Sequence, residues 1–76
     1  MNNKALVARW VNIPPEFKYV AKDWCGAIYA YSKYPHVTGK IWSVEGQCAI
    51  SKRLTADQCS DPHNVRWCCS VQERHA

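Results

Sequence analysis

One stretch of the chain decides its fold: residues 19–32, YVAKDWCGAIYAYS. Two runs rich in aromatic and β-branched side chains flank a short polar segment, a pattern that predicts a β-hairpin. Asp23 can begin the turn through its own side chain, and Gly26 supplies the positive φ that such a turn or a bulge needs. We therefore expect an extended strand over residues 19–22 and a second strand over residues 27–32.

The second strand of this hairpin has two different faces. Because side chains alternate along a strand, Tyr29 and Tyr31 share one face, while Ile28 and Ala30 share the other. The sequence thus predicts an aromatic face and an aliphatic face on one sheet.

A second hairpin is predicted farther along the chain. Residues 41–44 would form its first strand, Glu45 and Gly46 its turn, and residues 47–50 its return strand. Gly46 is chosen because it readily adopts left-handed dihedral angles.

The segments around these hairpins carry weaker signals. Residues 6–13 predict a short strand that stops at Pro14 and Pro15, and residues 15–17 predict one helical turn. Residues 54–64 are rich in turn-forming side chains and predict a loop.

The last segment allows two interpretations. Asn64 is a good helix N-cap, and Trp67, Val71 and Arg74 follow a helical spacing, which predicts a short helix over residues 65–74. A strand through residues 65–71 is the alternative. We favour the helix, because this stretch shows no clean alternation and few β-branched residues.

These elements predict one small domain, residues 1–76, of the α+β class and rich in β-structure. We expect an antiparallel meander of three to five strands, with the short C-terminal helix across one face. A chain of 76 residues buries only about 60% of its unfolded surface, which leaves little room for a buried active site of several residues.

Charge and hydropathy exclude other classes of protein. The formal charge is +4, and residues 1–53 carry eight basic and three acidic side chains, so the positive charge is concentrated there. No run of roughly 18 apolar residues could span a membrane, and the first residues do not resemble a signal peptide. We therefore expect a protein of the reducing cytosol.

Five cysteines in so short a chain raise the question of metal. Three thiolates and an imidazole could bind zinc; the candidates are Cys48, Cys59, His63 and Cys68. No CxxC pair occurs to preorganise such a site. We expect thiols without metal or disulfide, and no cofactor, and the zinc alternative stays open at this stage.

No catalytic signature is present in the sequence. The histidines His36, His63 and His75 could titrate near neutral pH, and Cys59 with His63 could form an activated thiolate. Neither arrangement has an orienting third group, so we do not expect an enzyme.

A longer pattern runs through most of the chain. It consists of Trp10-x-x-Ile13-Pro14, Phe17-x-Tyr19-Val20-Ala21-x-Asp23-x-x-Gly26-x-x-Tyr29-Ala30-Tyr31-x-x-x-Pro35, Trp42 and Trp67-x-x-Ser70-Val71-x-x-Arg74. This pattern resembles a group of short proteins of unassigned function encoded by tailed bacteriophages and prophages. The chain departs from the group at Trp24-Cys25, where two polar or acidic residues are usual.

The resemblance implies a phage origin and a shared fold more than a chemistry. Small phage proteins without catalytic motifs often bind and disable a host protein, so it implies a protein-binding inhibitor or modulator in the host cytoplasm, used in host takeover or anti-defence. Fold-level analogy does not define a site.

Nine aromatic rings are too many for a core of this size, and exposed Trp, Tyr and Arg are typical of binding hot spots. We expect Trp10, Trp42 and Trp67 in the core. The predicted partner-binding residues are Trp24, Tyr29, Tyr31, Lys33, Tyr34 and Lys40.

Nucleic-acid binding is the alternative function. Tyr29 and Tyr31 could stack on bases within a basic surface. That surface would consist of Lys22, Lys33, Lys40, Lys52 and Arg53.

Overall fold

The computed structural model describes residues 5–75 and is built from short strands. A central antiparallel sheet has four strands in the order β6-β3-β2-β8, and two smaller two-stranded ribbons accompany it. The central strands are β2 (Tyr19–Lys22), β3 (Ile28–Tyr31), β6 (Ser51–Arg53) and β8 (Gln72–Glu73). The ribbons pair β1 (Val7–Ala8) with β7 (Cys59–Ser60) and β4 (His36–Thr38) with β5 (Ile41–Ser43).

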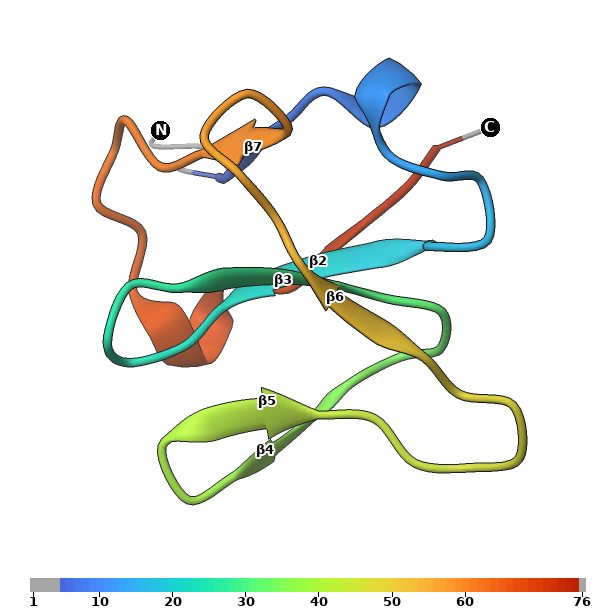
Figure 1. The fold of residues 1–76 in the computed structure, drawn as a ribbon. Coiled ribbons are helices and arrows are strands. Elements are labelled where there is room, and N and C mark those ends of the chain that lie inside the picture. The colour runs from blue at the N-terminus through green and yellow to red at the C-terminus, as the bar shows by residue number, and fades with distance from the viewer. Residues whose placement is uncertain (1–4, 76) are drawn as a thin grey trace.

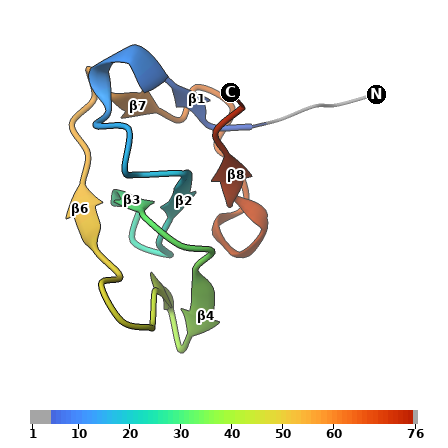
Figure 2. The same ribbon diagram turned by 90° about the vertical axis from the view of Figure 1, so that its right-hand side faces the viewer.

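The two ribbons cover opposite faces of the central sheet (Figure 1). Figure 2 shows β1 and β7 on one side of the sheet and the β4–β5 ribbon on the other. The β-rich, antiparallel architecture predicted from the sequence is therefore confirmed. Within residues 5–75, no helix is long and apolar enough to cross a membrane.

The β2–β3 hairpin forms as predicted. Tyr19 lies opposite Tyr31 and Lys22 opposite Ile28, so the two strands pair along their whole length. Asp23 N–H donates to the carbonyl of Ala27 at 2.8 Å, and Gly26 adopts a φ of 95°. The turn thus uses the positive φ for which Gly26 was selected.

The alternation predicted for β3 divides the interior into two cores. On the β1–β7 side, Ala30 belongs to a buried apolar cluster, with Ile28 packed against it. This cluster consists of Leu6, Ile13, Phe17, Val20, Ala30, Leu54, Cys59 and Val65. On the β4–β5 side, Tyr31 is buried with Ala21 and Trp42, and Tyr29 packs against them.

The prediction of the second hairpin is wrong. β5 pairs with β4, which precedes it, and the turn between them uses Gly39 at a φ of 64°. Residues 47–50 form no strand, and β6 pairs with β3 instead. Gly39 and Gly46 both adopt positive φ, so glycine alone did not identify the hairpin turn.

The predicted C-terminal helix is also wrong. Trp67–Cys69 forms a single 3-10 turn, and the chain then enters β8, which pairs with β2. Asn64 adopts a φ of 51° and caps nothing. A helix of roughly three turns is marginal in water, whereas β8 satisfies backbone groups that would otherwise be left at the edge of β2.

The first segment and the predicted loop each contain shorter elements than the sequence predicts. Residues 6–13 contain β1 and then a 3-10 turn, Trp10–Asn12, in place of one longer strand. The turn at residues 15–17 is present, because Phe17 N–H donates to the carbonyl of Pro14. The predicted loop over residues 54–64 includes the two residues of β7.

Arg74 joins the two ends of the described chain. Its guanidinium lies 4.7 Å from the centre of the Trp10 ring and donates to the carbonyls of Trp10, Ile13 and Pro14. Ser70 adds a second link, because its hydroxyl accepts a hydrogen bond from Lys22 N–H at 2.8 Å. These contacts give structural roles to Trp10, Ser70 and Arg74.

Candidate functional site

The β2–β3 turn presents a large side chain to solvent. Trp24 is 58% exposed, although the residue before it, Asp23, is buried. Its backbone N–H donates to the carbonyl of Lys40 at 3.3 Å, which ties the turn to the β4–β5 turn. The Lys40 ammonium lies 4.5 Å from the centre of the Trp24 ring, within the range of a cation–π contact.

A groove of about 430 Å³ lies beside Trp24. It separates the β2–β3 turn from residues 64–67, and Arg66 and Trp67 line its far side. Among residues 5–75, no acidic side chain lines this groove. Arg66 and Lys22 line it, although Lys22 is paired with Asp61, and Lys40 lies over the neighbouring Trp24 ring. We call this region the tip surface, defined by Trp24, Cys25, Lys40, Arg66 and Trp67.

The other predicted contact residues do not join the tip surface. Tyr34 is 55% exposed, but it follows the opposite end of β3 and packs edge-on against Tyr19, with ring centres 5.2 Å apart. Lys33 precedes it and donates to the carbonyl of Gln47 at 3.0 Å. The six predicted residues therefore fall into two separate regions, with Tyr29 and Tyr31 between them.

Tyr31 is not a surface residue. It is 2% exposed, and its hydroxyl donates to the carbonyl of Trp42 at 3.2 Å. Burial, and then the negative charge of Asp23, raise the pKa of Tyr31 above its usual range. The ring cannot stack on a nucleic-acid base without opening the core.

The basic residues of the nucleic-acid alternative are also dispersed. Lys22 is buried in an ion pair with Asp61, and Lys40 covers Trp24. Lys52 and Arg53 are exposed on β6. Only part of the predicted basic surface is therefore available near Tyr29.

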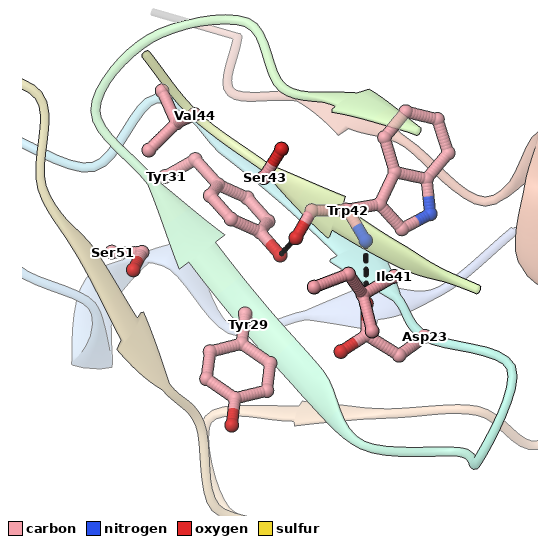
Figure 3. Close-up of a pocket in the computed structure, with 8 residues that line it drawn as sticks. All are labelled: Asp23, Tyr29, Tyr31, Ile41, Trp42, Ser43, Val44 and Ser51. Carbon is pink, nitrogen blue, oxygen red and sulfur yellow. Dashed lines mark hydrogen bonds between the residues drawn. The ribbon is translucent and has the colours of Figure 1, made fainter. Parts of the chain in front are cut away.

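A second hollow lies between the central sheet and the β4–β5 ribbon. It is a cavity of about 380 Å³ (Figure 3). Its lining residues come from the β2–β3 turn, from β3, β5 and β6, and from the residue after β5: Asp23, Tyr29, Tyr31, Ile41, Trp42, Ser43, Val44 and Ser51. We call it the Asp23 cavity, because Asp23 supplies the one formal charge among these side chains.

The sequence identified only part of these two regions. Asp23 was recognised as a turn former, and nothing in its local sequence shows that β5 would pack over it. Arg66 and Trp67 were assigned to a helix, so their place beside Trp24 was missed. A usable signal was Trp24, a large aromatic residue in the short segment between the two predicted strands.

The candidate zinc ligands are not brought together. Within the part of the chain that the structure describes, no group of three or more His, Cys, Asp or Glu side chains could hold a metal ion. Cys59 is buried, whereas Cys48 and Cys68 are exposed. The thiols of Cys68 and Cys69 lie 4.0 Å apart, without a disulfide.

Cys59 is also a poor nucleophile. Burial, and then the nearby Asp61 carboxylate, raise the pKa of Cys59 to about 11, against a smaller opposing effect of a backbone hydrogen bond. The thiol is therefore protonated near neutral pH, and the thiolate is the reactive form. His63 is exposed, and within residues 5–75 no hydrogen bond joins it to Cys59.

Comparisons with known proteins found no relative of this chain. No family model, no curated protein and no solved structure matches the chain.

Proposed function

We propose that this chain is a non-enzymatic, phage-derived protein that binds a host protein through the tip surface and inhibits or modulates it. The observation that carries the proposal is Trp24, a large aromatic side chain held at an exposed position on a well-anchored turn. Tryptophan is among the residues most enriched in binding hot spots.

The backbone around Trp24 is fixed before any partner arrives. Asp23 N–H donates to Ala27, Gly26 N–H donates to Asp23, and Trp24 N–H donates to Lys40. A side chain on an ordered turn loses less conformational entropy on binding than one on a mobile loop. The ring and the groove beside it therefore form a preorganised anchor.

The charge of the tip surface selects the chemistry of the partner. Lys40 and Arg66 flank the aromatic rings, and the whole chain carries a formal charge of +4. Complementary potentials accelerate encounter and suppress wrong partners. We expect an acidic host surface with an apolar pocket that accepts the Trp24 ring.

The phage origin and the host cytoplasm as the site of action rest on the sequence resemblance. Trp24-Cys25 lies where this chain departs from the resembling proteins, and both residues belong to the tip surface. We expect the target to be particular to this protein rather than common to the group.

The test is a capture experiment followed by a binding measurement. Tagged protein is incubated with bacterial lysate, and the captured host protein is purified and titrated with the wild type, Trp24→Ala and Val11→Ala. Val11 is 93% exposed and lies in the 3-10 turn at residues 10–12, so it controls for the loss of an exposed apolar side chain.

We expect Trp24→Ala to weaken binding by about 30-fold, corresponding to ~2 kcal/mol for a hot spot, and Val11→Ala to have no effect. Equal binding by all three proteins, or no specific capture, would contradict the proposal.

Nucleic-acid binding is the competing outcome, supported by Lys52 and Arg53 exposed on β6. It would show as an affinity for DNA or RNA that falls steeply with salt, with a slope of about −0.9 per phosphate contact on duplex DNA. Such a result, unaffected by Trp24→Ala, would replace protein binding as the proposed function.

A further inference from the structure

The Asp23 cavity is independent of the tip surface and contains an unusual carboxylate. Asp23 is 7% exposed, and one carboxylate oxygen accepts a hydrogen bond from Trp42 N–H at 2.9 Å. Figure 3 shows the other carboxylate oxygen directed away from this bond, on the side of Tyr29. It accepts no hydrogen bond from any residue in the described range 5–75.

No cation from residues 5–75 accompanies this buried carboxylate. The salt bridge found among residues 5–75 joins Lys22 to Asp61, and no Lys, Arg or His nitrogen of this range lies within 4.0 Å of Asp23. Arg53 lies opposite Tyr29 in the neighbouring strand, but it is exposed and does not line the cavity. The free oxygen of Asp23 is reached from the cavity rather than fully buried, so a cation bound there can pair with it in a mostly dehydrated setting.

The remaining lining suits an organic cation. The rings of Tyr29 and Tyr31 lie side by side, with centres 6.4 Å apart, and aromatic faces attract cations. The hydroxyl groups of Ser43 and Ser51 can accept hydrogen bonds, and Ile41 and Val44 offer aliphatic contact. An anion would meet the negative charge of Asp23 without any basic lining residue to offset it.

We propose that the Asp23 cavity binds a short organic cation, an ammonium or guanidinium group on an aliphatic chain. Its charge pairs with the Asp23 carboxylate, and its chain lies against the tyrosine rings and Ile41. A cavity of about 380 Å³ is within the usual size range of small-molecule sites.

The direct test compares a cation with a neutral molecule of the same shape. The full chain is titrated with n-butylammonium and with 1-butanol, and binding is followed by calorimetry and by backbone amide shifts. We expect the cation to bind about tenfold or more tightly than the alcohol, with shifts concentrated at Tyr29, Ile41 and Ser51. Equal binding of the two, or shifts elsewhere, would overturn the proposal.

Two variants define the role of Asp23. Asp23→Asn keeps an oxygen that can accept the Trp42 N–H bond but removes the charge, and we expect it to weaken n-butylammonium binding about tenfold or more. Asp57→Asn removes an exposed loop carboxylate and is the matched control. Unchanged affinity in Asp23→Asn, or an equal loss in Asp57→Asn, counts against the site.

A third variant covers the case in which Asp23→Asn fails to fold. Ser51→Leu places a larger side chain in the lining from the exposed strand β6 and should block the cation while leaving Asp23 intact. Retained binding in Ser51→Leu would contradict the proposal. Trp24→Ala should not change cation binding, so this result stays separate from the test of the tip surface.

The source of the cation is distinguished by a second pair of probes. Putrescine represents a free amine, and an acetylated, amidated Gly-Lys-Gly peptide represents a lysine side chain of a protein. Tighter binding of either identifies the source and supports the site. Failure of both to bind, in addition to n-butylammonium, would overturn it.

Discussion

Each face of the central sheet has one carboxylate, the partly buried Asp61 on one and the buried Asp23 on the other, and the two have different partners. On the β1–β7 face, Asp61 is paired with the buried Lys22 ammonium and also accepts a hydrogen bond from Val65 N–H. On the β4–β5 face, Asp23 has one backbone donor and no cation within residues 5–75. We call the β1–β7 face the closed face because its charge is neutralised, although a hollow of about 320 Å³ opens beside Asp61. The β4–β5 face leaves a charge without a cation from residues 5–75 beside its cavity.

This difference assigns the stability of the fold mainly to one face of the sheet and ligand binding to the other. The β1–β7 face gathers the aliphatic side chains and Phe17, whose burial supplies most of the hydrophobic stabilisation. The β4–β5 face is built from tyrosine and tryptophan rings. These rings leave a cavity that polar side chains also line. We expect substitutions on the β1–β7 face to change the free energy of unfolding and substitutions on the β4–β5 face to change ligand affinity.

The largest effect is expected from Phe17→Ala on the closed face. Phe17 is 5% exposed, and truncating a buried phenylalanine costs about 3–5 kcal/mol. A domain of this size has little stability to lose, so we expect the variant to be largely unfolded at 25 °C. Circular dichroism with urea titration measures this, and a cooperative transition close to that of the wild type would contradict it.

The next effect compares the two carboxylates directly. Lys22→Met leaves Asp61 without its cation, and we expect a loss of about 3 kcal/mol. Asp23→Asn should change the free energy of unfolding by no more than about 0.5 kcal/mol, because the acceptor for Trp42 N–H is kept and an unpaired charge is removed. Urea titration of both variants checks this order, and the reverse order would contradict the contrast between the faces.

Acid should weaken the closed face through Asp61. Burial alone would raise the pKa of Asp61, but the hydrogen bonds from Lys22 and Val65, together with the charge of Lys22, outweigh burial and hold the pKa below its ordinary value of 3.8. A carboxyl whose folded-state pKa is lowered stabilises the fold above its unfolded-state pKa, and this contribution disappears as pH falls through the folded-state pKa.

We therefore expect the wild type to lose stability as pH falls below about 4, with the difference between wild type and Asp61→Asn shrinking over the same interval. Urea titrations at pH 6 and pH 3 measure this difference. A difference that stays constant between these pH values would show that Asp61 does not carry the effect.

The smallest effect on stability is expected at the tip surface. Trp24 is mostly exposed, so Trp24→Ala should change the free energy of unfolding by about 0.5 kcal/mol or less. Thermal unfolding with Val11→Ala as control measures this. A large loss of stability would mean that the Trp24 ring belongs to the core and is not available to a partner.

Local sequence predicted the parts of the fold that form locally. Residues 19–32 contain both strands and the turn of one hairpin, so Gly26 and the alternation of Tyr29 and Tyr31 were sufficient to predict it. The β-rich class and the two sheet faces followed from the same residues.

The missed parts depend on partners distant in the chain. Glu73 lies opposite Tyr19, so no periodicity within residues 65–74 could reveal that they would end in a strand. The choice between Gly39 and Gly46 as a hairpin turn depended on which strand would cover Tyr31. The Asp23 cavity exists only after that choice, and it therefore could not be predicted from residues near Asp23.

The position of β8 beside β2 has a consequence for synthesis of the protein. β2 lies early in the chain, but its outer edge pairs with Gln72 and Glu73, and Arg74 then fixes the backbone at residues 10–14. β8 begins 50 positions after the last residue of β2, so the ribosome delivers it much later. The edge of β2 that β8 covers therefore stays unpaired in the nascent chain until residues 72 and 73 have emerged from the ribosome.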